Sequence, residues 1–156
     1  MNLPALNFPQ YRFRFITKEG KTYIFDNIRK KYVFLSPEEW VRQNTIRYLT
    51  ETLKYPSALM AVEYPFHVNR MKKRADIVVF KPAGKPWLLV ECKAPQVAVT
   101  RRTLEQALRY NMELNTPYFM LTNGLNHYFC RLNYENRTFT FVENLPAYRD
   151  ENPSGT

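Results

Sequence analysis

Several features common in proteins of this size are missing from the sequence, and each absence excludes a class of protein. Its only cysteines, Cys92 and Cys130, have no CxxC spacing, which excludes a metal finger and a disulfide framework. No apolar run is long enough to cross a bilayer, and the first residues do not combine a basic segment with an apolar one as a secretion signal does. We therefore expect a cytoplasmic protein with two reduced thiols.

Several common catalytic patterns are also missing. There is no glycine-rich phosphate loop and no Ser/His or Cys/His nucleophile arrangement. His67 and His127 have no ligand partner at metal spacing, so we assign them no role. No repeat, low-complexity tract or linker divides the chain of 156 residues. We predict one domain over residues 1–145 and a loose polar tail over residues 146–156.

Positive charge is what the sequence has in excess. Lys and Arg number 23 against 14 Asp and Glu, which gives a formal charge of +9. A chain this basic favours a polyanionic partner, because binding phosphates releases counterions. Nucleic acid is our first interpretation, an anionic membrane surface is a weaker one, and a charge that only aids solubility is the bland alternative. A hydrophobic content of 45%, with 11 Tyr and 11 Phe, indicates a folded globular protein.

Two apolar runs form the centre of the chain. They read RADIVVF and WLLVECKAP, and the segment KPAGKP between them predicts a tight turn joining two antiparallel strands. Side chains alternate across a strand, so Glu91 and Lys93 share one face and Cys92 belongs to the core on the other. Asp76 on the neighbouring strand reaches the face of Glu91 if the two strands pair antiparallel.

These ionisable residues suggest a metal site. Two carboxylates close together in a poorly hydrated place repel each other unless a cation neutralises them. Mg²⁺ suits this role, since it takes one or two carboxylates together with water and phosphate oxygens. Lys93 beside the metal would orient a water nucleophile or stabilise charge on a phosphate. The alternative is structural: Glu91 and Lys93 form a solvated pair at a strand end, and Asp76 caps a turn.

A helix is predicted directly before this region. Ser36 caps it, Pro37 suits its first position, and Glu39 completes an S-x-x-E capping box. Glu38 and Arg42 fall on the apolar side of this helix, which would bring an acid to the interior or to the edge of a site. The alternative is that Glu38 interacts favourably with the helix dipole and pairs with Arg42.

Two basic segments are candidate nucleic-acid contacts. The first is a hairpin whose charges would be part of a DNA footprint or simply its solvated face. The second is a basic turn, residues 69–74, whose charges would stand at the mouth of a site centred on Asp76 or be merely solvated. The hairpin charges are Arg12, Arg14, Lys18 and Lys21, and those of the turn are Arg70, Lys72, Lys73 and Arg74.

The remaining elements complete the predicted order. We predict a hairpin over residues 11–26, a strand at 32–35, a helix at 37–54, and a strand at 59–68 interrupted at Pro65, with a bulge or an edge position. After the central strand pair come a helix at 101–114, capped by Thr100, and strands at 117–122, 126–132 and 138–142.

Together these residues resemble a known superfamily. Asp76, fourteen intervening residues and Glu91-Cys92-Lys93 look like the D…ExK signature of the PD-(D/E)xK nucleases. The element order is similar to their αβββαβ core, which implies a mixed β-sheet flanked by helices, an α/β (α+β) restriction-endonuclease-like fold, here with an N-terminal β-hairpin extension. Three motifs narrow the resemblance to the N-terminal nuclease domain of type I restriction enzyme R subunits: PEEWVRQ at 37–43, VECKAP, and Gln106-x-x-x-Tyr110.

The resemblance implies a role for each matching residue. Asp76 and Glu91, with the backbone carbonyl of Cys92, would ligate Mg²⁺, which Mn²⁺ can replace, and Lys93 would position the attacking water. Glu38 would be an outer acid near the metal, and Gln106 and Tyr110 would contact the DNA backbone or brace the site. Ala75 stands where the superfamily has the proline of its PD dipeptide. R subunits carry translocase domains after this one, and no Walker motif follows here, so we expect a domain without its own motor.

We therefore expect a Mg²⁺-dependent DNA endonuclease. The alternative is a DNA-binding or assembly module that keeps the nuclease fold and cleaves only with a partner, or never, and RNA as substrate stays open. One active site cuts one strand, so cutting both requires a homodimer or two visits. Further partners left open are a separate motor or specificity subunit, and we expect no membrane partner.

Overall fold

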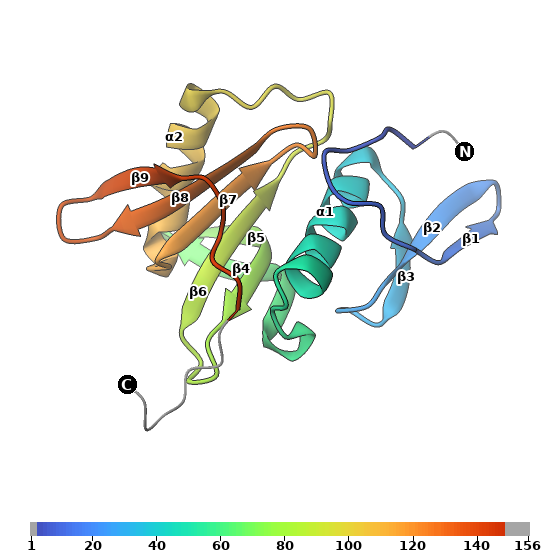
Figure 1. Cartoon of the computed structure of the whole chain (residues 1–156), viewed down its shortest axis with the longest axis horizontal. Helices are drawn as coiled ribbons and strands as arrows, with labels where there is room; N and C mark the ends of the chain where they lie inside the picture. Colours follow the sequence, from blue (N-terminus) through green and yellow to red (C-terminus); the bar gives the residue numbers. More distant parts are fainter. Residues whose placement is uncertain (1–2, 149–156) are drawn as a thin grey trace.

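A central helix separates two β-sheets. The computed structural model describes residues 3–148, in which α1 (Pro37–Arg47) lies between a three-stranded sheet and a six-stranded sheet (Figure 1). The three-stranded sheet is antiparallel and contains β1 (Phe15–Lys18), β2 (Lys21–Asp26) and β3 (Lys31–Phe34). The predicted hairpin and the strand after it therefore form one unit that packs on the outer side of α1.

The six-stranded sheet is mixed and follows chain order. Its strands run β4-β5-β6-β7-β8-β9, and every neighbouring pair is antiparallel except β6 and β7. The parallel pair is joined through α2 (Arg101–Asn111), because parallel strands need a long crossover connection. The strands are β4 (Met60–Val68), β5 (Met71–Phe80), β6 (Pro86–Cys92), β7 (Tyr118–Thr122), β8 (His127–Asn133) and β9 (Thr138–Val142).

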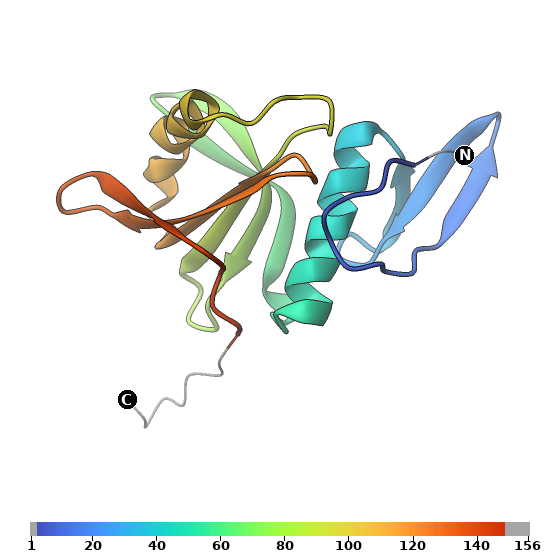
Figure 2. The ribbon, with the colours of Figure 1, turned by 45° about the horizontal axis from the view of Figure 1, so that its top comes forward.

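The two helices cover opposite faces of this sheet (Figure 2). Val90 and Cys92 of β6 pack in the cluster on the α1 side, whereas Leu89 packs with Leu104 and Leu108 of α2. Because both faces are covered, β6 is buried along its centre, as its continuous apolar run predicted. The element order α1, β4, β5, β6, α2, β7 confirms the predicted αβββαβ core and its α/β fold class, and β8 and β9 extend the sheet.

Only one of the two hydrogen bonds of the predicted capping box is present at the start of α1. The hydroxyl of Ser36 accepts a hydrogen bond from the Glu39 backbone N–H at 3.0 Å. The predicted return bond of a capping box, from the Ser36 N–H to the Glu39 carboxylate, is wrong: the Ser36 N–H donates to the Phe34 carbonyl. The Glu39 side chain turns inward to Arg29 and Gln43 instead. After α1 the chain continues in a π-helical turn, Tyr48–Thr52.

Strands β4 and β5 change faces where they pass Asp76. Met60 and Val62 of β4 pack in the cluster on the α1 side, but Tyr64 and Phe66 pack in the cluster on the α2 side. This change requires a local break in the alternation, and Glu63 supplies it with a left-handed backbone conformation, φ 54°. The irregularity predicted at Pro65 is therefore two residues earlier, and β4 is an edge strand, as predicted.

The predicted basic turn is shorter than expected. Only Asn69 and Arg70 form the turn between β4 and β5, both with positive φ. Residues 71–74 already belong to β5, because their pairing with β4 continues to the end of the hairpin, where Val68 pairs with Met71. Asp76 therefore lies in the middle of a long strand rather than near its start.

The rest of the chain follows the predicted order closely. Thr100 caps α2 by accepting from the Thr103 N–H at 3.2 Å, and β9 spans the predicted residues. Both cysteine thiols are free and buried. Among residues 3–148, no helix is long and apolar enough to cross a membrane. Most of the segment predicted as a loose tail, residues 149–156, lies outside the described residues.

Candidate active site

The register of the central strands brings the two predicted carboxylates together. Ile77 of β5 pairs with Val90 of β6, so Asp76 lies opposite the next residue along, Glu91. Asp76 is held in place from β6 itself: its Oδ2 accepts a hydrogen bond from the Cys92 backbone N–H at 2.7 Å. The structure thus brings Asp76 and Glu91 to one place, as the antiparallel interpretation required.

Burial makes Asp76 an unusual acid. Its side chain is only 16% exposed. Loss of water around it raises its pKa to about 6, while the Cys92 N–H and the Arg42 guanidinium oppose this shift, and Glu38 and Glu91 add to it by repulsion. Asp76 is thus insufficiently neutralised by the protein, a condition typical of functional sites.

Glu91 and Lys93 face each other on the same side of the strand. The Nζ atom of Lys93 lies 3.5 Å from Oε1 of Glu91, and the two side chains are 37% and 28% exposed. The second oxygen of Glu91, Oε2, is buried and has no hydrogen-bond partner among the described residues. A buried carboxylate oxygen without a donor is a position where a cation would be stabilised.

Arg42 of α1 completes the site, and our sequence reasoning did not assign it there. One of its terminal nitrogens, Nη2, lies 3.3 Å from Oδ1 of Asp76. Its other nitrogens approach Glu63 at 3.4 Å and Glu39 at 3.7 Å, but Nε and Nη1 make no hydrogen bond within the described part of the chain. Arg42 is therefore a buried cation shared among three carboxylates, rather than the partner of Glu38.

A second charged cluster, centred on Arg29, shares the carboxylates of Glu39 and Glu63 with Arg42. Arg29 donates to Asp26 at 2.6 Å and to Glu39 at 2.9 Å, and it lies 3.4 Å from Glu63. Gln43 donates to both Asp26 and Glu39 at 3.0 Å. These bonds connect the three-stranded sheet, α1 and β4. In the sequence, the one signal for this buried charged cluster was the set of polar residues Glu39, Arg42 and Gln43 on a helix face that also carries apolar residues.

Two of the other predicted site residues, Glu38 and Gln106, lie on the surface. Glu38 is exposed in the first turn of α1, yet it is close enough to Asp76 to raise the pKa of that carboxyl. Gln106 is exposed on α2, and the helix places Tyr110 one turn further on, although its side chain lies outside the described residues. The structure thus puts Glu38 near the acid pair, and Gln106 on the helix of the opposite face.

The predicted basic contacts surround the start of β5. Arg70 and Lys72 are exposed, and Lys73 is partly buried. Arg74 lies 3.8 Å from the Glu63 carboxylate, so part of its charge is balanced locally. These side chains belong to the hairpin that leads into Asp76, the place where phosphate contacts were expected.

The donor set suits a hard cation. Asp76, Glu91 and the backbone of Cys92 offer oxygen ligands, and the unpartnered Oε2 of Glu91 is available to one. No group of three or more His, Cys, Asp or Glu side chains within residues 3–148 could hold a metal. Two carboxylates would leave the remaining positions of a hard cation to water and phosphate oxygens, which is the usual manner of binding for Mg²⁺.

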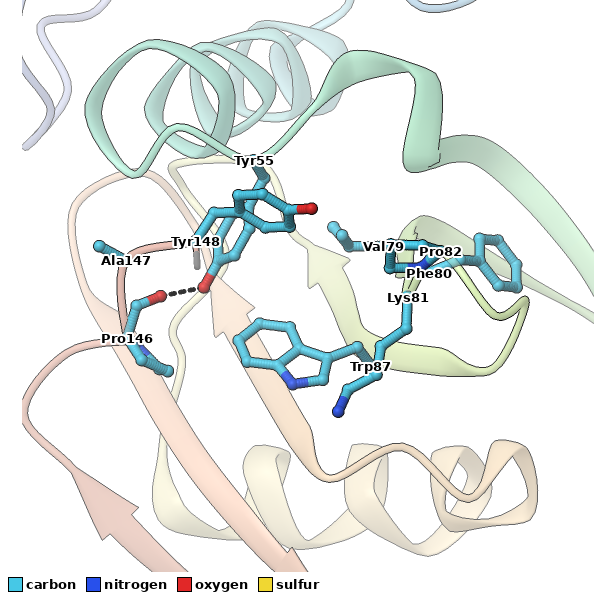
Figure 3. Close-up of a pocket in the computed structure, with 9 residues that line it drawn as sticks. All are labelled: Tyr55, Val79, Phe80, Lys81, Pro82, Trp87, Pro146, Ala147 and Tyr148. Atoms are coloured by element: carbon cyan, nitrogen blue, oxygen red, sulfur yellow. Dashed lines mark hydrogen bonds between the residues drawn. The ribbon is translucent and has the colours of Figure 1, made fainter. Parts of the chain in front are cut away.

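An apolar cavity lies elsewhere, at the turn between β5 and β6 (Figure 3). Its volume is about 410 Å³, and its walls include Trp87, Tyr55 and Tyr148. The hydroxyl of Tyr55 donates to the Pro146 carbonyl beside it. The cavity contains none of the carboxylates, so it is not part of the acid site.

Comparison with known proteins identifies one family. The model of the family described as "Type I restriction enzyme R protein N terminus" matches residues 37–146, which is most of the chain. No curated protein matches the chain. The matched segment begins at the first residue of α1 and includes Arg42, Glu63, Asp76, Glu91 and Lys93.

Proposed function

Because the chain belongs to the family of the type I restriction enzyme R protein N terminus, we propose that it is a restriction-type nuclease that hydrolyses DNA. In this proposal the acid pair Asp76 and Glu91 holds Mg²⁺, or Mn²⁺ in its place. The observation that supports it most directly is the adjacent acid pair, with its raised pKa at Asp76 and its buried, unpartnered oxygen at Glu91. A purely structural ion pair would have both carboxylates satisfied.

Each residue of the site then has a chemical task. Mg²⁺ bound there would polarise the scissile phosphate and favour ionisation of a water molecule. Asp76 and Glu91 would be the protein ligands, and the Cys92 N–H fixes the orientation of Asp76. Lys93, whose ammonium already lies beside Glu91, would orient the attacking water and stabilise the negative charge that develops on the phosphate.

Arg42 would act as the internal counter-charge of the site. Without a metal it balances Asp76 at 3.3 Å, and it also has Glu63 within 3.4 Å. When a cation neutralises Asp76, Arg42 keeps a carboxylate partner in Glu63 and Glu39, so no buried charge is left unpaired. The site can therefore bind and release a cation with little rearrangement of the fold.

Cleavage tests the proposal directly. Supercoiled plasmid and linear single-stranded DNA are incubated with the protein in Mg²⁺ and then in Mn²⁺, with Lys93→Ala as the matched control. We expect the wild type to cut and the variant to be slower by at least about a hundredfold, because a positioned catalytic group contributes roughly that much. Equal cutting by both proteins would rule out the proposed role of Lys93.

A second candidate function is a DNA-binding or assembly module with a nuclease fold. It is favoured by the direct contact of Arg42 with Asp76, which gives that carboxylate a permanent positive partner within the protein. Calorimetric titration with Mn²⁺ separates the two functions. A nuclease site binds Mn²⁺, and Asp76→Asn abolishes that binding. The module shows no Mn²⁺ binding and binds DNA without any metal. The remaining subunits of a type I restriction system are the partners to test next.

A further inference from the structure

The three-stranded sheet has one face that packs on the molecule and one that does not. Ile24 and Asp26 of β2 are fully buried toward α1, where Asp26 accepts from Gln43. Tyr23 and Phe25 alternate with them and therefore lie on the opposite face. We call this the outer aromatic face. Strand register adds the other members, so that the face comprises Ile16, Tyr23, Phe25, Tyr32 and Phe34, with Arg14, Lys18 and Lys21.

Large apolar side chains are exposed on this face. Ile16 is 39% exposed, and of the rings Phe34 is 53% and Tyr32 36% exposed. Two cross-strand ring pairs hold them in place: Tyr23 with Phe34, whose centroids are 6.0 Å apart, and Phe25 with Tyr32, at 5.1 Å, both edge-on. Such rings are fixed by the sheet rather than by a neighbouring element, and a contiguous exposed apolar patch usually marks a binding surface.

The charges on the same face are all positive. The Arg14 guanidinium lies 4.1 Å from the centre of the Phe25 ring, and Lys18 pairs with Lys21 across the strands. Of the described residues on this face, none is acidic: Asp26 is buried on the other side, and Glu19 belongs to the turn between β1 and β2. The face thus combines flat apolar rings with cations.

We propose that the outer aromatic face binds single-stranded DNA, with bases stacked on Tyr32 and Phe34 and phosphates beside Lys18, Lys21 and Arg14. Only an unpaired strand offers both exposed base planes and a regular row of negative charges, because a duplex hides its bases in the stack. The face complements such a strand in charge and offers it exposed rings for stacking.

A second copy of the chain is a poorer partner for this face. Packing the face against itself about a two-fold axis brings the cations of one copy to the same surface as those of the other, and like charges there are repulsive.

Hydrogen bonds connect the sheet that carries this face to α1, the helix of Arg42. Asp26, at the end of β2, accepts from Gln43 of α1, and Arg29 in the next turn donates to Glu39 of the same helix. A strand bound to the face is thus held by an element attached to the helix that carries Arg42. The proposed binding does not depend on cleavage, and it can be tested with the metal removed.

The test is fluorescence anisotropy in EDTA with a fluorescein-labelled oligothymidylate of about 12 nucleotides, within the usual size range of single-strand sites. A duplex of the same length is measured alongside. We expect the wild type to prefer the single strand and Tyr32→Ala/Phe34→Ala to bind it at least roughly tenfold more weakly, given the usual contribution of base stacking. Lys18→Gln/Lys21→Gln should weaken binding and reduce its salt dependence.

Phe141→Ala is the matched control. Phe141 is also an exposed ring on a sheet, 43% exposed, and it too has a guanidinium nearby, that of Arg101 at 5.6 Å. We expect it to leave binding unchanged. Unchanged binding by Tyr32→Ala/Phe34→Ala would overturn the proposal, as would an equal loss on the duplex. So would a wild type that dimerises in sedimentation equilibrium while the double variant stays monomeric, which would show that a second copy covers the face.

A second variant guards against loss of folding. Phe34→Trp keeps a ring at the most exposed position and adds an indole whose fluorescence should be quenched when a base stacks on it. Quenching by oligothymidylate beyond that of the wild type, in a protein with an unchanged melting temperature, supports the proposal. Tight binding without additional quenching would place the strand elsewhere and contradict it.

Discussion

Two buried aspartates on either side of α1 have opposite properties. Asp26 has a fully buried side chain, yet its pKa is lowered: burial alone would raise it, but hydrogen bonds from the backbone N–H and the guanidinium of Arg29 outweigh that effect. Asp76 is slightly exposed, and its pKa is raised to about 6. Hydrogen-bond and ion-pair partners, rather than the degree of burial, therefore decide whether the ionised form of a buried acid is stabilised.

The number of donors explains the difference. Asp26 accepts from the N–H groups of Ile28 and Arg29, from the Arg29 side chain and from Gln43. Asp76 accepts one short bond from Cys92 and has Arg42 at 3.3 Å. We interpret the first acid as structural and the second as an acid that is left incompletely neutralised, which suits a group that binds a cation.

The largest expected effect is the loss of stability when Asp26, the structural acid, is replaced. Asp26→Ala removes the partner of a buried guanidinium, and breaking such a pair typically costs about 3–5 kcal/mol of unfolding free energy. Urea denaturation at neutral pH measures this loss. A small change in midpoint would show that Glu39 and Glu63 are sufficient partners for Arg29, and the comparison would then fail.

The pH dependence of the same acid has a definite sign. Because the folded-state pKa of Asp26 lies below its ordinary value of 3.8, its stabilisation is present above that pH and is lost on acidification. We expect the wild type to lose stability below about pH 4 and Asp26→Ala to lose less over the same range. Thermal melts in a pH series compare the two proteins.

Asp76→Asn is expected to stabilise the metal-free protein, whereas Asp26→Ala destabilises it. The folded protein holds the Asp76 proton more tightly than the unfolded chain, so stability from this group decreases as pH rises from about 4 through about 6. Replacing the acid by a neutral amide should raise the melting temperature of the metal-free protein at pH 7.5 and leave it little changed below about pH 4, where Asp76 is protonated in both states. The same variant should lose Mn²⁺ binding in calorimetry. A lower melting temperature at pH 7.5 would show that the Arg42 contact outweighs desolvation.

Arg42→Gln should give a smaller effect on the same acid. Arg42 lowers the pKa of Asp76, so its removal should raise that pKa further, by roughly one unit for a lost charge at this distance. Carboxyl NMR titration of the metal-free protein measures the shift. An unchanged pKa would show that Glu63 and Glu39, rather than Asp76, are the main partners of Arg42.

The smallest predicted effect is that of Glu38→Gln. Glu38 is exposed, and it raises the pKa of Asp76 only through its charge. The variant should lower that pKa by roughly a few tenths of a unit, and 1 M salt should largely abolish the difference. A shift that persists in high salt would indicate a direct contact.

Local sequence rules predicted the parts of the site that lie on adjacent strands. The two apolar runs and the turn between them specify an antiparallel pair, whose register sets Asp76 opposite Glu91, with Lys93 beside Glu91. The same rules predicted the caps at Ser36 and Thr100, because a cap depends only on residues within one turn.

Tertiary structure alone decided what surrounds these residues. Arg42 meets Asp76 and Glu63, and Arg29 meets Glu39, across segments that are distant in the chain. No local pattern specifies such contacts, since they arise only when α1 packs between the two sheets. The face change at Glu63 is likewise a product of packing against two helices.

The N-terminal sheet shows the same division. Alternation in the sequence predicted a hairpin with a solvated basic face, and the side chains of Arg14 and Lys18 do lie on the solvated side. Pairing with β3 added Tyr32 and Phe34 to that face, beside Tyr23 and Phe25 of β2. The sequence by itself thus determined the elements, the adjacent acids and the charge of the chain. Only the tertiary structure decided which charges neutralise each other and which rings remain exposed, because both depend on neighbours that the chain brings together from a distance.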